Sequence, residues 1–166
     1  MERKLRDLSK KGDTAGGVIA CQIQGVPAGW GEPVFNKMNA RLAYGVMGIN
    51  ATKGIEFGSG FLGTERTGSQ ENDSFESKEK TTSNNSGGIQ GGISNGQDIF
   101  FRTAFKPVSS IKMKQKTIKE NGDAVNINIE GRHDPVVLPR AVPIIESMVS
   151  LVLADFYLYQ HIQSIK

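Results

Sequence analysis

Cysteine and histidine are scarce in this chain, with one cysteine, Cys21, and two histidines among 166 residues. A lone cysteine excludes an intrachain disulfide and is typical of a reducing compartment, so we expect a cytoplasmic protein. No group of Cys and His has the spacing of a metal site, and no nucleophile elbow is present. A metal centre and a serine hydrolase are therefore not indicated. The charged N-terminus lacks the apolar core of a secretory signal.

Long uninterrupted apolar runs are also missing. The longest apolar stretch, residues 141–159, is broken by Pro143, Glu146 and Asp155. A helix that spans a membrane needs about 20 consecutive, mostly apolar residues. We therefore expect this stretch to form a buried helix, and we expect no membrane partner.

An excess of positive charge is confined to one end of the chain. The formal net charge is +3, but residues 1–11 carry five basic and two acidic side chains, which leaves 15 of each sign elsewhere. A basic domain of the kind that binds nucleic acid is therefore not indicated. Residues 99–119 form a local exception, with six basic residues and no acidic one. Three of them alternate, as on a solvated strand face: Lys112, Lys114 and Lys116.

Two other cations in that stretch, Arg102 and Lys106, flank more apolar sequence and are better candidates for an anion site. Binding of single-stranded RNA is an alternative, because phenylalanines lie near these cations. Phe101 and Phe105 would share one strand face, however, with Arg102 and Lys106 on the other. Core packing of the aromatic rings is therefore favoured, and we expect no nucleic-acid partner.

The chain has the length of a single domain, residues 1–166, and its patterns predict an α+β fold with antiparallel hairpins. Hydrophobic periodicity and turn signals predict these elements: a helix over Glu2–Lys11, a strand over Gly17–Gly25, a helix over Pro33–Met47, a strand over Ala51–Phe57, a hairpin over Gly92–Phe105 around Asn95-Gly96, a hairpin over Lys112–Ile129 turning at Asn121–Asp123, and a helix over Val142–Ile162.

Residues 64–88 are polar, and Phe75 is their only large apolar residue. A segment of this length and composition cannot bury enough apolar surface to order itself, so we predict a mobile loop without secondary structure.

Two glycine-rich segments resemble nucleotide-binding loops only superficially. Gly58–Gly63 fits the pattern G-x-G-x-x-G, but polar loop sequence follows where a helix is required. Residues 86–96 lack the Gly-Lys-Ser/Thr of a phosphate-binding loop. The second segment is either a flexible approach to a hairpin or backbone that packs against a planar ligand.

Two compact sequences point to a phosphorylated ligand. Lys106–Ser110 places a cation and two hydroxyls beside a proline-fixed turn, a chemistry suited to phosphate oxygens. Gly131–Pro135 places a guanidinium, an imidazole and a carboxylate on consecutive residues between a glycine and a proline. Asp134 beside Arg132 is either a structural ion pair or a catalytic group, and the residue types alone leave both open.

Several segments, in this order along the chain, together resemble one enzyme family. They are Gly12–Thr14 with Gly16-Gly17, Gly29–Phe35, Met47–Glu56, Gly68-Ser69 with Asn72-Asp73, Gly87–Gly96, Lys106–Ser110, Gly131–Pro135, and Arg140–Pro143 with Glu146. The family is chorismate synthase, and the resemblance covers essentially residues 12–160.

The resemblance implies a carbon–oxygen lyase of the shikimate pathway, which serves aromatic amino acid biosynthesis. The family converts 5-enolpyruvylshikimate 3-phosphate to chorismate and phosphate by a 1,4-elimination. It requires reduced FMN, although the overall reaction is redox-neutral. The implied fold is a β-α-β sandwich of antiparallel sheet packed on long helices, usually assembled as a homotetramer.

The resemblance also implies roles for individual residues. Arg132 resembles the residue at the junction of flavin and substrate, and Asp134 resembles the carboxylate beside flavin N5, where it acts as a proton acceptor. Lys106 and Ser110 resemble the contacts to the flavin phosphate. The other implied FMN contacts are Asn50, Ala51, Gly91, Pro107, Val108 and Ser109.

Members of the family are much longer, and this chain resembles only their C-terminal part. The family's two catalytic histidines and most of its substrate-binding arginines lie in the other part. We therefore expect the parent protein to be the enzyme and this chain alone to be inactive. The alternative is a non-catalytic anion-binding or interaction module that retains half of the site. The coding sequence upstream of Met1 separates the two, because an open frame with a His-Gly motif supports the enzyme.

Overall fold

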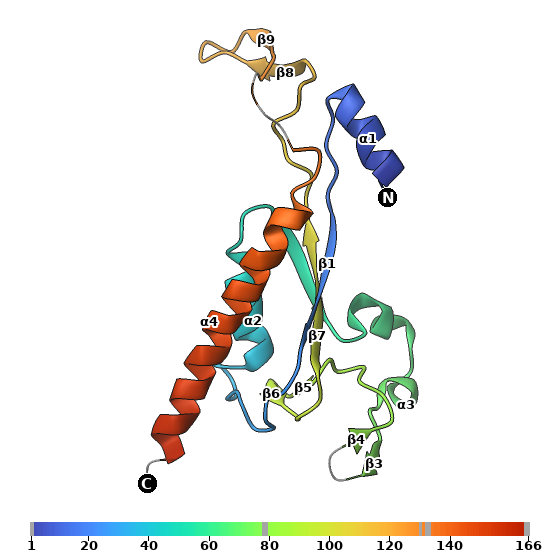
Figure 1. The fold of residues 1–166 in the computed structure, drawn as a ribbon, viewed down its shortest axis with the longest axis vertical. Coiled ribbons are helices and arrows are strands. Elements are labelled where there is room, and N and C mark those ends of the chain that lie inside the picture. Colours follow the sequence, from blue (N-terminus) through green and yellow to red (C-terminus); the bar gives the residue numbers. More distant parts are fainter. Residues whose placement is uncertain (1, 78–79, 130, 132–133, 165–166) are drawn as a thin grey trace.

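The computed structural model describes residues 2–77, 80–129, 131 and 134–164. At its centre lies a three-stranded antiparallel sheet with the order β1-β7-β2. Helices α2 and α4 contact each other and lie on one face of this sheet (Figure 1). The central elements are β1 (Gly17–Ile23), α2 (Met38–Met47), β2 (Thr52–Phe57), β7 (Ile99–Phe105) and α4 (Leu138–Ser164).

This arrangement confirms the predicted α+β class and the antiparallel sheet packed on long helices. It supplies one sheet layer and the helix layer of the expected sandwich. The smaller elements are α1 (Glu2–Lys11), η1 (Gly60–Glu65), α3 (Gly68–Glu71), β3 (Phe75–Ser77), β4 (Lys80–Thr81), β5 (Ile89–Gln90), β6 (Ile93–Ser94), β8 (Gln115–Ile118) and β9 (Ala124–Ile127).

The central strand β7 is fixed by the alternation of its side chains. Ile99, Phe101, Thr103 and Phe105 are buried against the helices, whereas the residues between them are only half-buried. This confirms that Phe101 and Phe105 share one face and belong to the core, where Met38, Leu42 and Val46 of α2 meet them. The two rings are therefore not available for stacking on nucleotide bases.

Helix α2 starts at Met38, later than the predicted start at Pro33. The Met38 N–H donates to the Gly92 carbonyl at 2.7 Å, so the β5–β6 hairpin satisfies the first turn of the helix from outside. The contact is close, because a Cβ on Gly31 would lie 2.3 Å from the same Gly92 oxygen. Residues 33–36 form bends, and the helix begins two residues after them.

The predicted hairpin around Asn95-Gly96 is wrong. Strand β6 pairs with β5 across the turn at Gly91-Gly92, whereas β7 pairs with β1 and β2. Gly91 and Gly92 have φ values of 62° and 94°, the left-handed conformation that this turn requires. Asn95 instead accepts a hydrogen bond from the Gln97 N–H at 3.0 Å, in a turn that joins two different sheets.

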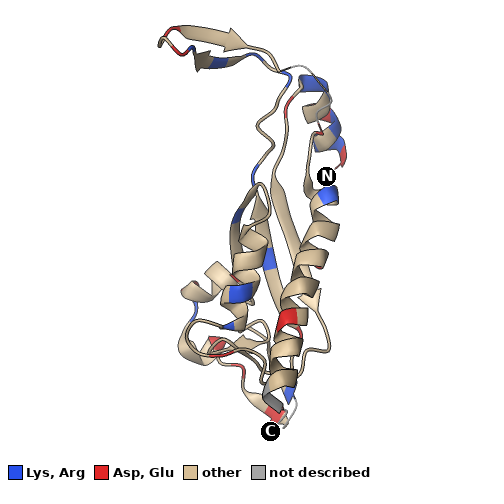
Figure 2. Ribbon diagram, turned by 90° about the vertical axis from the view of Figure 1, so that its left-hand side faces the viewer, with Lys and Arg blue, Asp and Glu red and all other residues tan. Residues whose placement is uncertain are grey.

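The expectation of a buried helix over Val142–Ile162 is correct for one face of α4 only. Ala141, Ile145 and Val149 are buried against the rest of the chain, and the helix starts earlier, at Leu138. The opposite face has exposed apolar side chains, and Figure 2 shows few charged residues along this helix. By length and composition alone, Leu138–Ile162 is apolar enough to cross a membrane. One such helix is only weak evidence of a membrane span, because core helices pass the same test. The exposed residues are Val142, Ile144, Leu151, Tyr157, Leu158, Tyr159 and Ile162.

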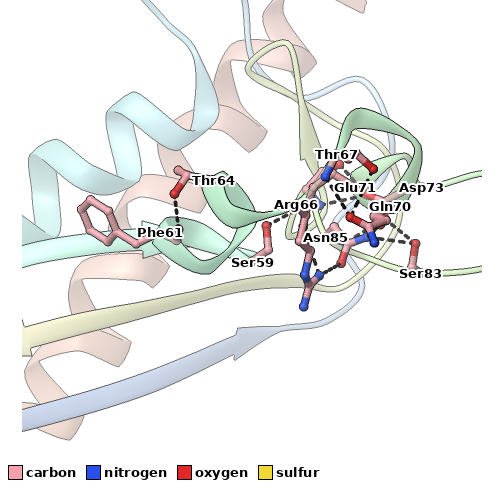
Figure 3. A network of polar contacts seen from close by, with 11 residues as sticks. Ser59, Phe61, Thr64, Arg66, Thr67, Gln70, Glu71, Asp73, Ser83 and Asn85 are labelled. Carbon is pink, nitrogen blue, oxygen red and sulfur yellow. Dashed lines mark hydrogen bonds and ion pairs between the residues drawn. The ribbon is translucent and has the colours of Figure 1, made fainter.

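The prediction that residues 64–88 lack secondary structure is wrong, because short elements occur along the segment. What the sequence analysis missed is a polar cluster around Asp73, which is 5% exposed. One carboxylate oxygen accepts from Ser83 Oγ and the Asn85 N–H, both at 2.7 Å (Figure 3). The other oxygen accepts from the Ser86 N–H at 2.8 Å and from Ser86 Oγ. Polar bonds thus replace apolar burial in this segment. Its mobility stays a prediction that hydrogen exchange tests.

The Asp73 carboxylate is held in its charged form. Burial, the largest single influence, raises its pKa, but the hydrogen bonds from Ser86, Ser83 and Asn85 together lower the pKa below its ordinary value. A lowered folded-state pKa means that the charged group stabilises the fold above the ordinary Asp value of about 3.9. This contribution is lost as pH falls through the lowered value.

Asp73→Asn is expected to destabilise residues 83–88 locally, by about 1–3 kcal/mol, the scale for an unsatisfied buried polar group. Each carboxylate oxygen accepts from a backbone N–H, so an amide must point its NH₂ at one of these donors. Amide hydrogen exchange at Asn85 and Ser86 measures the effect.

Asp98→Asn is the matched control. Among the described residues, both hydrogen bonds to the Asp98 carboxylate come from side-chain amides, Gln22 Nε2 and Gln24 Nε2, and reach a single oxygen. An asparagine oxygen can keep both, so little change is expected. Equal protection of Asn85 and Ser86 in both variants would contradict the role given to Asp73.

Candidate functional site

Two of the segments predicted to hold a ligand meet at the end of β7. The Lys106 N–H donates to the Ala51 carbonyl at 2.9 Å, which joins Lys106–Ser110 to the turn at Asn50-Ala51. Ala51 has φ 71°, and it is the only non-glycine residue with a positive φ in the described part of the chain. Strained backbone of this kind persists where the surroundings enforce it, often at ligand sites. The structure thus brings Asn50, Ala51 and Lys106 together.

The Lys106–Ser110 segment presents an ammonium and two hydroxyls for which the described part of the chain shows no side-chain partner. Lys106 and Ser109 are exposed and Ser110 is half-buried. Among the described residues, no carboxylate lies within ion-pair distance of the Lys106 ammonium. A free ammonium beside two hydroxyls fits the oxygens of a phosphate group. The donor set therefore fits the phosphate of FMN.

Arg102, the other candidate cation, is not free. Its Nε lies 2.8 Å from Glu56 Oε1, although the N–H is not aligned for a hydrogen bond. The pair lies on the sheet face opposite the helices, since Arg102 alternates with the buried residues of β7. The Glu56 carboxylate balances the charge of Arg102, which makes Arg102 a weaker candidate for an anion site than Lys106.

The segment that bears Asp134 lies beside residues 12–15, near the N-terminal end of the chain. Pro135 accepts a hydrogen bond from the Ala15 N–H at 2.8 Å, and Ala15 forms a parallel bridge with Val136. A small cavity of about 30 Å³, with room for about one water molecule, lies between the two segments. Its lining residues are Ser9, Gly12, Asp13, Thr14, Lys112, Asp134 and Pro135.

The Asp134 side chain is 34% exposed, and its Oδ2 lies 2.7 Å from Nη1 of Arg140, which is 75% exposed. An ion pair this open to solvent contributes little to stability, about 0–1 kcal/mol. The carboxylate therefore remains accessible to a bound molecule. Arg132, its expected neighbour, and His133 lie outside the described residues, so their predicted roles stay predictions.

Gly91 is not brought next to the other predicted cofactor contacts. It lies in the β5–β6 turn beside the start of α2, whereas Asn50 and Ala51 follow the end of that helix (Figure 1). Helix α2, with 10 residues, is about 15 Å long. A Cβ on Gly91 would meet nothing within 4 Å, so its backbone is open to a ligand, but at the other end of the helix.

The glycines of the G-x-G-x-x-G pattern have structural roles. Gly58 and Gly60 have φ values of 56° and 54°, and a Cβ on Gly58 would lie 1.9 Å from the Asn85 carbonyl oxygen. The pattern leads into the short 3-10 helix η1 rather than into a long helix that could hold a pyrophosphate.

Comparisons with known proteins agree with the resemblance found in the sequence. The family model described as chorismate synthase matches residues 1–158. The chorismate synthase of Christiangramia forsetii is 55% identical over 158 residues, and that of Cytophaga hutchinsonii is 56% identical over 158 residues. These alignments cover 95% and 93% of this chain, but 45% and 44% of the relatives.

A solved structure supports the same assignment. A crystal structure of chorismate synthase superposes with a TM-score of 0.77 at 31% sequence identity, covering 96% of this chain and 42% of the other. The chain thus spans less than half the length of the relatives it matches. Its sequence and its fold both assign it to one family: the chain belongs to the chorismate synthase family.

Proposed function

We propose that the protein containing this chain is an FMN-dependent chorismate synthase. The observation that carries the proposal is the 55% identity to a chorismate synthase over 95% of this chain. The reaction is the 1,4-elimination of phosphate from 5-enolpyruvylshikimate 3-phosphate, in which a carbon–oxygen bond and a carbon–hydrogen bond break and a proton and phosphate leave. Because the chain spans 45% of that relative, the activity is assigned to the whole protein.

Each segment of the site has a separate task in this proposal. Lys106 and Ser110, with Ser109, hold the phosphate of FMN, and the backbone at Asn50-Ala51 borders the cofactor. Reduced FMN, when bound, supplies electron density that assists departure of the substrate phosphate. Asp134 accepts a proton near the reacting atoms, for which an accessible carboxylate is suited. Arg132 contacts both cofactor and substrate.

Assembly and location follow the same proposal. The protein acts in the cytoplasm, which agrees with its lone cysteine. Burial, and then the nearby Glu146 carboxylate, raise the pKa of the Cys21 thiol above its ordinary value. It assembles as a homotetramer. Gly91 contributes to flavin binding only if the complete site reaches the far end of α2.

Complementation tests the proposed function. The full-length gene is expected to restore growth without aromatic amino acids to a strain that lacks chorismate synthase. A soluble, folded product that does not restore growth would contradict the proposal.

Lys106→Ala in the full-length protein is expected to weaken FMN binding by about 1.5–3 kcal/mol, the scale for hydrogen bonds to charged groups. The loss should be smaller for riboflavin, which has no phosphate for the ammonium to contact. Titration of both flavins, followed by fluorescence, measures the difference. Lys116→Ala, an exposed lysine on β8, is the control and should bind both flavins normally. Equal losses for the two flavins in Lys106→Ala would show that Lys106 acts through folding.

A further inference from the structure

The short segment Thr14–Gly16 contacts the backbone on both sides of Lys106. Thr14 is buried, with 9% exposure, and its Oγ1 donates to the Val108 carbonyl at 2.7 Å, although the two residues are 94 positions apart. A Cβ on Gly16 would lie 2.3 Å from the Phe105 carbonyl oxygen and 3.0 Å from Pro107. Val108 lies midway between Lys106 and Ser110. The Thr14 hydroxyl therefore fixes the middle of Lys106–Ser110, the proposed phosphate-binding segment.

The same segment also contacts the chain around Asp134. Between Thr14 and Gly16, the Ala15 N–H donates to the Pro135 carbonyl at 2.8 Å. Consecutive residues thus hold the two halves of the site: Thr14 and Gly16 hold the segment that bears Lys106, and Ala15 holds the segment that bears Asp134.

We propose that Thr14 is a positioning residue of the flavin site: its buried hydroxyl holds Lys106–Ser110 at a fixed place relative to Asp134. This inference rests on the proposed FMN site. Thr14 makes no contact with the cofactor in this account and acts only through the Val108 carbonyl. Donors that bind a phosphate must be held to within about 0.5 Å, so loss of one fixing bond in an exposed loop is felt in affinity.

The test compares two buried threonines that make the same kind of bond in different places. Thr81 is 8% exposed, and its Oγ1 donates to the Ser83 carbonyl at 2.6 Å, in the β3–β4 region. Thr14→Val and Thr81→Val each replace a hydroxyl with a methyl group of similar size. Both variants lose one hydrogen bond to a backbone carbonyl, but only Thr14→Val loses a bond to the phosphate-binding segment.

In the full-length protein, the Kd of FMN is expected to rise about 5-fold or more in Thr14→Val, on the scale of one neutral hydrogen bond. Thr14→Ser, which keeps the hydroxyl, should restore the affinity, and Thr81→Val should bind FMN like the wild type. The Kd of riboflavin should rise less than that of FMN in Thr14→Val, because the effect passes through the phosphate-binding segment. Thermal unfolding of each variant reports stability separately.

Equal FMN affinities of Thr14→Val and Thr81→Val would overturn the inference, and so would a Thr14→Ser variant as weak as Thr14→Val. If Thr14→Val does not fold, Thr14→Cys takes its place, because a thiol is a weaker donor of similar size. An FMN affinity of Thr14→Cys equal to that of Thr14→Ser would then overturn it. Wild-type protein that does not bind FMN at all would refute the proposed function itself, a result distinct from these.

Discussion

Asp134→Asn in the full-length protein is expected to lower kcat by about 10²-fold or more, the usual scale for a general acid–base group. The amide has the shape of the carboxylate and can still accept a hydrogen bond from Arg140, but it cannot take up a proton. FMN affinity should change little, because the proposed phosphate contacts lie on Lys106–Ser110. Steady-state rates of chorismate formation and a flavin titration measure the two quantities separately.

Arg140→Met is the control for this variant, because it removes the ion pair and leaves the Asp134 carboxylate in place. An ion pair with a partner that is 75% exposed contributes little, so the rate should stay within a few-fold of the wild type. Wild-type turnover by Asp134→Asn would contradict the proton-acceptor role. Equal loss in both variants would show that Asp134 acts as part of the ion pair.

The isolated chain, residues 1–166, is expected to fold but to form no chorismate with reduced FMN and substrate. The alignment covers only 45% of the length of the Christiangramia forsetii chorismate synthase, so more than half of that enzyme's residues have no counterpart in this chain. The expected change is complete loss of turnover relative to the full-length protein. A discontinuous assay for chorismate, with purified chain at high concentration, measures it.

The surface of the described chain supports this expectation. Strands β1 and β2 are the edges of the central sheet, and β7 alone is paired on both sides. One face of α4 is apolar and exposed, with Leu151 at 66% and Ile162 at 71%. Open edges and apolar faces of this kind mark surfaces that other parts of a folded protein cover.

Three outcomes bear on this prediction. Circular dichroism with the expected helix and sheet content, together with no product, would support it. Measurable turnover by the purified chain would contradict it. Tight FMN binding without turnover would favour the alternative, an anion-binding module that keeps half of the site.

The central elements were predictable because local sequence and tertiary packing agree there. Alternation in Ile99–Phe105 and the apolar face of Met38–Met47 specify a strand and a helix that bury the same side. The turn at Asn121–Asp123 joins β8 to β9, as its residues indicate. In each case the pattern of one short segment is enough to predict its own secondary structure.

Other features depend on residues far apart in the chain, which no local pattern reveals. Asn95-Gly96 has the signal of a hairpin, but β7 pairs instead with β1 and β2 on its two sides. Residues 64–88 have too little apolar surface to predict order, and Asp73 provides hydrogen bonds that composition does not report. Local composition underestimates the structure that one buried carboxylate can organise.

The candidate site also has some features that local sequence predicts and others that depend on distant residues. The residue types of Lys106–Ser110 pointed to phosphate, and within the described residues no carboxylate pairs with the Lys106 ammonium. The sequence marks Thr14 and Gly16 only as part of a segment typical of the family. Their individual roles arise from contacts with residues about 90 positions away. A buried threonine beside a glycine has no local signal that identifies its partner.

The most direct test of the central claim is the formation of chorismate by the purified full-length protein, with and without reduced FMN, under anaerobic conditions. The account predicts chorismate and phosphate in equal amounts, formed only when reduced FMN is present, with no net consumption of the flavin. Product formed equally well without flavin, or no product from folded protein saturated with reduced FMN and 5-enolpyruvylshikimate 3-phosphate, would contradict it.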